Sequence, residues 1–144
     1  IISSYSILYN TGSDTADAIL SERQKQLEKK VKINFSGNFS KLPEDNFDIC
    51  VLLNNTIDIA LFGLQSITSE GEKLIEISAM CKQGVLLYKI SFPCENAGFF
   101  EDLQSSKDDM LKMNILRKLT EKNDGKMDTH IENQVASITV RYIF

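Results

Sequence analysis

The chain has 144 residues, of which 42% are hydrophobic and 25% charged, values typical of a globular protein rather than a fibrous or disordered one. Its formal net charge of −4, with dispersed basic residues, argues against nucleic-acid binding, which needs a clustered positive surface. No apolar run reaches the ~20 residues that span a bilayer. The sequence therefore predicts one soluble domain over residues 1–144, with no membrane contact.

The amino-terminal part of the chain predicts a strand, a helix and a second strand. Residues 5–9 form a short aromatic and aliphatic run that stops at a polar turn, as strands do. Apolar positions recur at helical spacing over residues 15–30, and Ser13 or Asp14 can cap the start of that helix. Residues 31–35 alternate between apolar and polar, which predicts a strand with one buried face.

The middle of the chain predicts a central strand, a capped helix and a further strand. Residues 47–53 are almost continuously apolar, which is typical of a parallel strand covered on both faces. Residues 56–67 fit either a short helix or a strand, and helix is favoured. A Ser-Glu-Gly-Glu capping box opens a predicted helix over residues 69–84. Residues 85–92 then predict a strand.

The carboxyl-terminal part adds helices and one last strand. A helical turn is expected over residues 97–103, a capped helix over 105–122, a break at 123–126 and a strand over 134–144. Five strands interleaved with at least three helices imply right-handed crossovers between parallel strands. The expected fold class is therefore α/β, a three-layer sandwich with a mostly parallel sheet.

Residues 42–92 carry a resemblance to a known family. A Leu-Pro-x-x-x-Phe-Asp segment leads into the apolar run, and Lys82 and Gly84 precede an aliphatic strand. This order resembles the middle of class I S-adenosylmethionine methyltransferases, which have a Rossmann-like fold and a Lys-Pro-Gly-Gly turn. Gln83 replaces the proline of that turn, and Val85 replaces its second glycine.

The glycine-rich loop that such methyltransferases use for their cofactor is absent. The loop over residues 9–14 holds one glycine, and the next predicted strand ends in Ser36 and Gly37 without an acid. A shortened methyltransferase-like domain of this kind is similar to the amino-terminal domain of the anamorsin family. The resemblance implies a pseudo-enzyme in cytoplasmic iron–sulfur cluster assembly, which docks a protein partner such as a diflavin reductase. That family's clusters lie on a separate cysteine-rich region.

No residue is expected to be catalytic, to bind a cofactor or to hold a metal ion. His130 is the only histidine and is expected in an exposed polar loop. Asp45 and Asp48 could form a carboxylate pair for acid–base chemistry, but a turn or capping role is favoured. Cys50 lies in an apolar run, where a thiol packs as a small hydrophobe.

Three further features are better explained by structure than by chemistry. Cys81 and Cys94 are widely spaced in sequence and, with Cys50, suggest a reducing compartment. Residues 12–14 resemble a phosphate-binding turn, but they lack its lysine and are interpreted as a helix cap. An aromatic and methionine stripe could bind a partner, although core packing is favoured; it comprises Phe99, Phe100, Met110 and Met113.

Two alternative functions remain open from the sequence. The chain could be a divergent methyltransferase that binds S-adenosylmethionine through residues 10–14 and through Asn54 and Asn55 at the end of the central strand. It could also be an adaptor or scaffold subunit of a eukaryotic complex, with an unrelated α/β fold in which residues 56–67 form a strand.

Overall fold

The computed structural model describes residues 9–42, 47–105 and 107–144. Its elements in chain order are α1 (Asp14–Gln26), β1 (Val31–Gly37), α2 (Phe47–Leu64), β2 (Lys73–Lys82), β3 (Val85–Pro93), α3 (Phe99–Asp102), the 3-10 helix η2 (Leu103–Ser105), α4 (Lys107–Lys122), β4 (Lys126–Glu132) and β5 (Val135–Ile143). The described strands form one sheet in the order β1-β2-β3-β5-β4. Only β1 and β2 run parallel, and the other neighbouring pairs are antiparallel.

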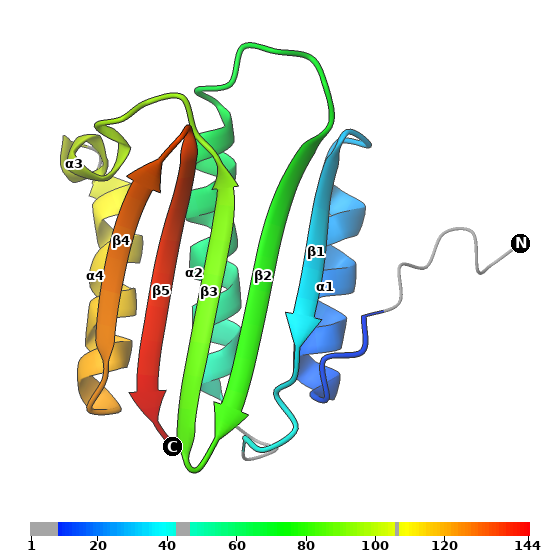
Figure 1. Ribbon diagram of the computed structural model, residues 1–144, viewed down its shortest axis with the longest axis vertical. Helices are drawn as coiled ribbons and strands as arrows, with labels where there is room; N and C mark the ends of the chain where they lie inside the picture. Colours follow the sequence, from blue (N-terminus) through cyan, green and yellow to red (C-terminus); the bar gives the residue numbers. More distant parts are fainter. Residues whose placement is uncertain (1–8, 43–46, 106) are drawn as a thin grey trace, which may run out of the picture.

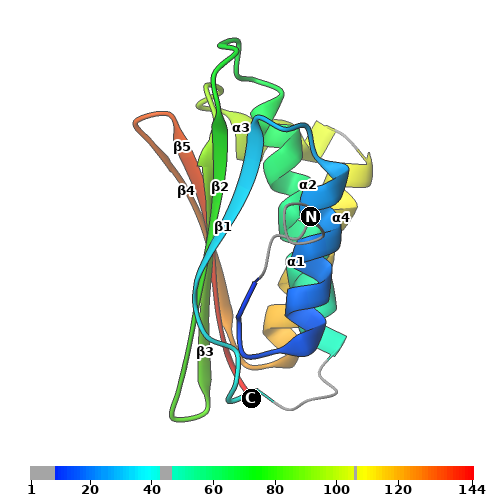
Figure 2. The same ribbon diagram turned by 90° about the vertical axis from the view of Figure 1, so that its right-hand side faces the viewer.

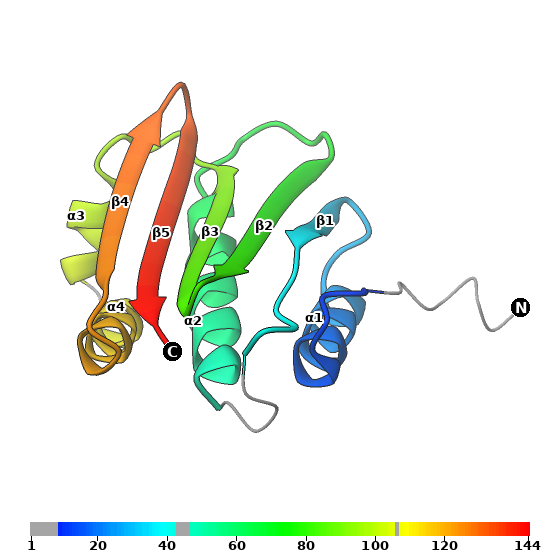
Figure 3. The same ribbon diagram turned by 60° about the horizontal axis from the view of Figure 1, so that its bottom comes forward.

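The fold has two layers (Figures 1 and 2). The helices α1, α2 and α4 all lie on one face of the sheet, and no described helix covers the other face. Seen from below, α1 lies behind β1, α2 behind the middle strands and α4 behind β4 and β5 (Figure 3). The expected three-layer sandwich with a mostly parallel sheet is therefore wrong. Tight hairpins join most of the strands, and antiparallel pairs need no helical crossover.

The apolar run at residues 47–53 belongs to a helix and not to a central strand. Helix α2 continues to Leu64, so the helix favoured from residue 56 onward is confirmed as far as that residue. The helix packs against β3, α1 and α4, and a helix that is buried on several sides is apolar on several sides. By length and composition alone α2 could cross a membrane, but half of it is buried within this domain, as a core helix is.

The helix predicted over residues 69–84 is a strand. In β2 the side chains of Ile75, Ile77 and Ala79 are buried, whereas Glu76 between them is exposed, which is the period of two of a half-covered strand. Gly84 does adopt the left-handed conformation, with φ +78°, and it shares a two-residue hairpin turn with Gln83 at φ +54°. Such a turn matches the twist of the strands that it joins.

Several elements lie where the sequence predicts them. Helix α1 begins after Ser13, whose Oγ accepts a hydrogen bond from the amide of Ala16 at 3.2 Å. The elements β1, β3, α3, α4 and β5 lie close to the predicted positions. Strand β4 is missed by the sequence analysis because this edge strand is mostly exposed and polar. The strand expected over residues 5–9 lies outside the described residues except for Tyr9.

One side chain ties α1 to the first strand. The Nε2 of Gln24 donates to the carbonyl of Val31 at 2.9 Å, and its Oε1 accepts from the amide of Ile33 at 2.7 Å. Gln24 is buried, so both ends of its amide need such partners. The Tyr9 hydroxyl donates to the carbonyl of Ile33 at 2.7 Å and fixes the start of the described chain beside β1.

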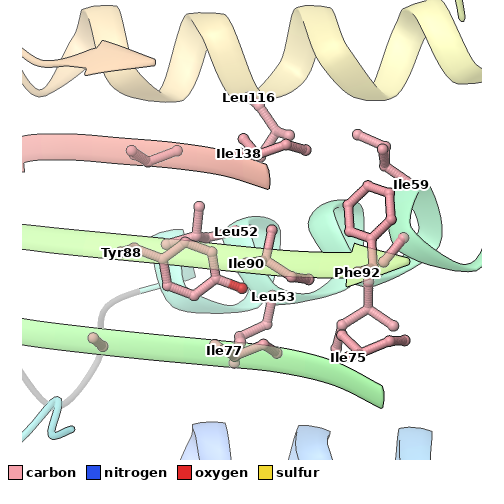
Figure 4. Packing of buried hydrophobic residues seen from close by; sticks show 14 of the residues in the cluster. Leu52, Leu53, Ile59, Ile75, Ile77, Tyr88, Ile90, Phe92, Leu116 and Ile138 are labelled. Atoms are coloured by element: carbon pink, nitrogen blue, oxygen red, sulfur yellow. The ribbon is translucent and has the colours of Figure 1, made fainter. Parts of the chain in front are cut away.

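The core lies between the helices and the sheet (Figure 4). Within it, the hydroxyls of Thr56 on α2 and Tyr88 on β3 lie 2.7 Å apart, and both residues are fully buried. Thr56 Oγ1 also lies 2.7 Å from the carbonyl of Leu52. Burial raises the pKa of the Tyr88 hydroxyl, and the hydrogen bond with Thr56 partly lowers it.

This contact predicts unequal effects of two deletions. Thr56→Val removes the partner of a buried Tyr88 hydroxyl and is expected to cost about 1–3 kcal/mol of unfolding free energy. Tyr88→Phe leaves Thr56 bonded to Leu52 and is expected to cost less. Urea unfolding of both variants and of the double variant measures the difference. Equal losses in the two single variants would contradict the described contact.

Candidate functional site

Helix α2 has two faces that are already occupied. Toward the sheet, Thr56 contacts Tyr88 as described. Toward α1, the guanidinium of Arg23 forms an ion pair with Asp58 and donates to the Oδ1 of Asn54 at 3.3 Å. These faces hold the helix in place, and their polar groups have protein partners.

The third face of α2 points toward α3 and α4. At its start, Lys122 on α4 donates to Asp48 at 2.8 Å, and Asn123 donates to the same carboxylate at 3.2 Å. At its end, Phe62 packs against Phe99 of α3 with 5.7 Å between the ring centroids. Two helical turns are close to seven residues, so the residue midway between Asp48 and Phe62 lies on the same face.

That midway residue is Asn55, a half-buried amide. Its Nδ2 donates to the carbonyl of Val51 at 2.8 Å, which orients the side chain along the helix. The Oδ1 then remains as an acceptor on the face that points toward α4. Amide oxygens suit a hard divalent cation or a hydrogen-bond donor of a ligand. Asn54 and Asn55 are thus adjacent in sequence but face different helices.

A cluster of aromatic rings closes the end of this face. Phe99 is the central ring, and the centroids of Phe62, Phe92 and Phe100 lie 5.7, 5.8 and 5.2 Å from its own. Gly63 on α2 makes room for the cluster, because a Cβ there would lie 2.5 Å from the Cε2 of Phe92. The short α3 segment is therefore anchored on α2 and β3 through Phe99.

A groove lies on the other side of the α3 segment. It has a volume of about 180 Å³ and is lined by Phe100, Glu101, Leu103, Gln104, Met110, Met113, Arg117 and Thr129. Its lining is half apolar and half polar, and the polar members are Glu101, Gln104, Arg117 and Thr129. Within this segment Phe99 contacts α2, whereas the neighbouring Phe100 lines the groove.

The predicted aromatic and methionine stripe does not form one surface. Phe99 and Met113 are buried, Phe100 is half-buried, and Met110 is exposed by 39%. Three of the four residues line the groove, and the fourth anchors α3. Partner binding by this stripe stays a prediction, and core packing holds for the two buried members.

His130 is exposed, as expected, and both His130 and Asp48 lie in elements other than the expected ones. His130 lies in strand β4 rather than in a loop, where its Nε2 is 3.2 Å from a carboxylate oxygen of exposed Glu132. Asp48 lies in the first turn of α2 and binds Lys122, while Asp45 lies outside the described residues. Within the described residues, no group of three or more His, Cys, Asp or Glu side chains is arranged to hold a metal ion.

The cysteines and the first turn have structural surroundings. Cys94 is buried, while Cys50 and Cys81 are half-buried, and burial raises the pKa of the Cys81 thiol. The turn before α1 is closed by Thr11, whose amide and hydroxyl both donate to Asp17, at 2.8 and 2.7 Å. The alternative cofactor site of the methyltransferase hypothesis required Asn54 and Asn55 at a strand end, and both lie within α2.

Comparison with known proteins assigns the fold to a family. Residues 45–142, from α2 to β5, match the family model described as the GHKL domain. No curated protein sequence matches the chain.

Solved structures of histidine kinases share the fold. The histidine kinase domain of the Erythrobacter litoralis EL346 blue-light activated histidine kinase is 11% identical, with a TM-score of 0.65 over 88% of this chain and 56% of that one. The catalytic domain of histidine kinase ThkA is 13% identical, with a TM-score of 0.58 over 90% and 87%. Full-length ShkA in complex with AMPPNP is 14% identical, with a TM-score of 0.56 over 89% and 28%. The chain thus spans little more than half of the Erythrobacter domain.

These findings overturn the methyltransferase and anamorsin interpretation. The GHKL match includes residues 47–92, on which most of that resemblance rested. The iron–sulfur assembly function, the diflavin reductase partner and the expectation of a pseudo-enzyme followed from the resemblance and are wrong, as is the divergent methyltransferase. The adaptor hypothesis needed a strand at residues 56–67, where α2 continues to Leu64.

Proposed function

This chain belongs to the GHKL domain family, and from that premise we propose that it is an ATP-binding catalytic domain of the histidine kinase type. The observation that carries the proposal is the family match over α2 to β5, the part of the chain that holds Asn55 and the groove. The ShkA structure supports it, because that protein shares the fold and holds AMPPNP, an analogue of ATP.

The nucleotide would bind along the third face of α2 and in the groove beside α3. The Oδ1 of Asn55 would coordinate a magnesium ion that binds together with the phosphates. Arg117, at the rim of the groove, would supply positive charge to the phosphates. Phe100 and Met113 would offer apolar contact to the base.

These side chains have the chemistry to bind ATP, but the groove in this conformation is too small to hold it. Small-molecule sites commonly have volumes of about 300–1,000 Å³. The groove of about 180 Å³ is smaller. Binding of a whole nucleotide would therefore require a wider site than this conformation offers.

The phosphoryl acceptor would be a histidine of a partner domain or protein. In the proposed reaction, the bond between the γ-phosphorus and the β,γ-bridging oxygen breaks, a phosphorus–nitrogen bond forms, ADP leaves and the imidazole loses a proton. His130, the only histidine of the chain, lies on β4 beside Glu132. A protein partner therefore remains part of the proposal, as does a cytoplasmic location, where ATP is present.

Thermal unfolding with and without magnesium-ATP tests the proposal. At a ligand concentration about 100-fold above the dissociation constant, binding stabilises the native state by about 2.7 kcal/mol. Asn55→Ala is expected to reduce this stabilisation in magnesium, and less so in EDTA. Asn54→Ala is the matched control, because it changes the same side chain on the face that binds Arg23.

A wild-type protein that gains no stability from ATP at millimolar concentration would contradict the proposal. Equal loss of ATP stabilisation in Asn54→Ala and Asn55→Ala would leave nucleotide binding standing, but it would remove the assignment of the site to the α4-facing side of α2.

A further inference from the structure

The geometry points to the open face of the sheet as a docking surface for an amphipathic helix of a protein partner, one whose apolar stripe is flanked by acidic residues. The surface lies at the end of the sheet where the β2–β3 hairpin turns, and it has an apolar centre surrounded by cations. This inference goes beyond the proposed function, because the helices that carry the proposed nucleotide contacts lie on the opposite face of the sheet (Figure 2).

Three exposed apolar side chains form the centre of the surface. Met80 on β2 and Leu87 on β3 are register partners. Ile143 on β5 lies opposite Val85, two residues before Leu87. Met80, Leu87 and Ile143 are exposed by 60, 43 and 55%, whereas the residue that precedes each of them is buried. The alternation of a strand therefore directs all three to the open face, where clustered apolar side chains are typical of an interaction site.

Four cations surround this apolar centre. Arg141 lies opposite Leu87, and Lys126 lies opposite Arg141. Lys82 and Lys89 each follow an apolar member of the centre by two residues on the same strand. Among the residues that the structure describes, none of the four forms an ion pair. Their charges are therefore available to the carboxylates of a partner.

A helix is the form of segment that suits this surface. Strands β2, β3 and β5 are each paired on both sides, so their backbone groups cannot bind an added strand. A segment that lies on this face must satisfy its own backbone hydrogen bonds, as a helix does. A hollow of about 250 Å³ next to the apolar centre offers room for a side chain of that helix, and its lining includes Ser78, Lys89 and Ser91.

Two observations favour a protein segment over an anionic membrane. Asp128 lies two residues from Lys126 on the same face, and Glu76 lies four residues from Met80. A flat bilayer would meet these acids together with the cations, whereas a helix about 10 Å wide can lie beside them. The net charge of −4 also opposes the approach of the domain to an anionic bilayer.

Fluorescence anisotropy with a labelled peptide tests the surface. The probe is a synthetic peptide of about 18 residues that forms a helix with a leucine stripe flanked by glutamates. The same peptide with lysines in place of the glutamates is its control. The acidic peptide is expected to bind about tenfold more tightly than the basic one, and its affinity is expected to fall as salt is added.

Two pairs of variants locate the binding. Met80→Glu places a negative charge in the apolar centre and is expected to weaken binding of the acidic peptide about tenfold. Leu111→Glu is its control, because Leu111 on α4 is exposed by 56% and lies away from this face. Lys126→Glu reverses one of the four cations and is expected to weaken binding about fivefold. Lys25→Glu makes the same change on α1 and is expected to have no effect.

The outcomes decide between the possible occupants of the face. Weaker binding by Met80→Glu and Lys126→Glu, with both controls unchanged, supports the docking surface. Equal affinity for the two peptides, or no binding of the acidic one, overturns it. Cosedimentation with vesicles of phosphatidylcholine and phosphatidylserine in equal parts tests the membrane: binding to the vesicles without binding to the acidic peptide overturns the protein partner. If circular dichroism shows that Met80→Glu does not fold, Lys126→Glu decides.

Discussion

Replacing Gly37 with alanine is expected to cause the largest loss of stability of the substitutions proposed for this protein. Gly37 ends β1 with φ +103°, a conformation that side chains resist, and a Cβ there would lie 1.8 Å from the carbonyl oxygen of Ala79. Ala79 is its register partner in β2, so the clash is with backbone that the sheet holds in place. A loss of about 3–5 kcal/mol is expected, against a typical total stability of about 5–15 kcal/mol.

The matched control is Gly71→Ala. No atom lies within 4 Å of a Cβ at Gly71, and its backbone is not left-handed. This variant is expected to change stability by no more than about 0.5 kcal/mol. Urea unfolding followed by circular dichroism compares the two. A Gly37→Ala protein with the wild-type midpoint would show that β1 and β2 do not meet as closely as described.

Leu53→Ala is expected to cost about 2–5 kcal/mol, the second large effect. Leu53 is fully buried on α2 and belongs to the cluster between that helix and the sheet (Figure 4). Truncation removes apolar contact and leaves a cavity, because the rigid sheet cannot collapse to fill it. The helix is packed on both flanks, so it has little freedom to shift.

Phe47→Ala is the control for Leu53→Ala. Phe47 is a larger apolar residue on the same helix, but 80% of it is exposed. Its loss is expected to change the unfolding free energy by less than about 0.5 kcal/mol. Equal midpoints in guanidinium for the two variants would contradict the assignment of the buried face of α2.

The sequence could predict the elements whose period is unambiguous. Residues 15–30 and 105–122 show helical spacing and good caps, and both regions hold helices. The run at residues 47–53 is almost continuously apolar, so it shows neither the period of a helix nor that of a strand. Only its length and its flanking residues could distinguish the two. The sequence that begins at residue 69 matches a capping box, which favours a helix. The burial of Ile75 and Ile77 in the sheet outweighs this local preference, and the segment forms β2.

The sequence also carries a hairpin signal that argues against the expected parallel sheet. Residues 75–79 alternate within the run 73–82, residues 85–92 are rich in strand formers, and only Gln83 and Gly84 separate the two runs. A two-residue turn containing glycine is a strong indication of an antiparallel pair. This signal is incompatible with a mostly parallel sheet and therefore with the methyltransferase interpretation.

The candidate site depends on structure that no short pattern encodes. Asn54 and Asn55 are the same residue type in one tract, and only the phase of α2 assigns one to α1 and the other to α4. The groove joins α3 and η2 to α4 and to Thr129 on β4, segments that meet only in the folded chain. The expected pseudo-enzyme has no site residue, and its methyltransferase alternative places Asn54 and Asn55 at a strand end, because both start from a methyltransferase-like fold.

The amide of Gln24 also has a consequence for how molecules of this protein meet one another. Strand β1 lies at the end of the described sheet, and an open edge can template a strand from a second chain. Gln24 occupies the carbonyl of Val31 and the amide of Ile33, and Tyr9 occupies the carbonyl of Ile33. These side chains form the hydrogen bonds that a neighbouring strand would otherwise form. The backbone groups of Val31 and Ile33 are therefore not available to pair with a strand of a second molecule, which disfavours aggregation through this edge.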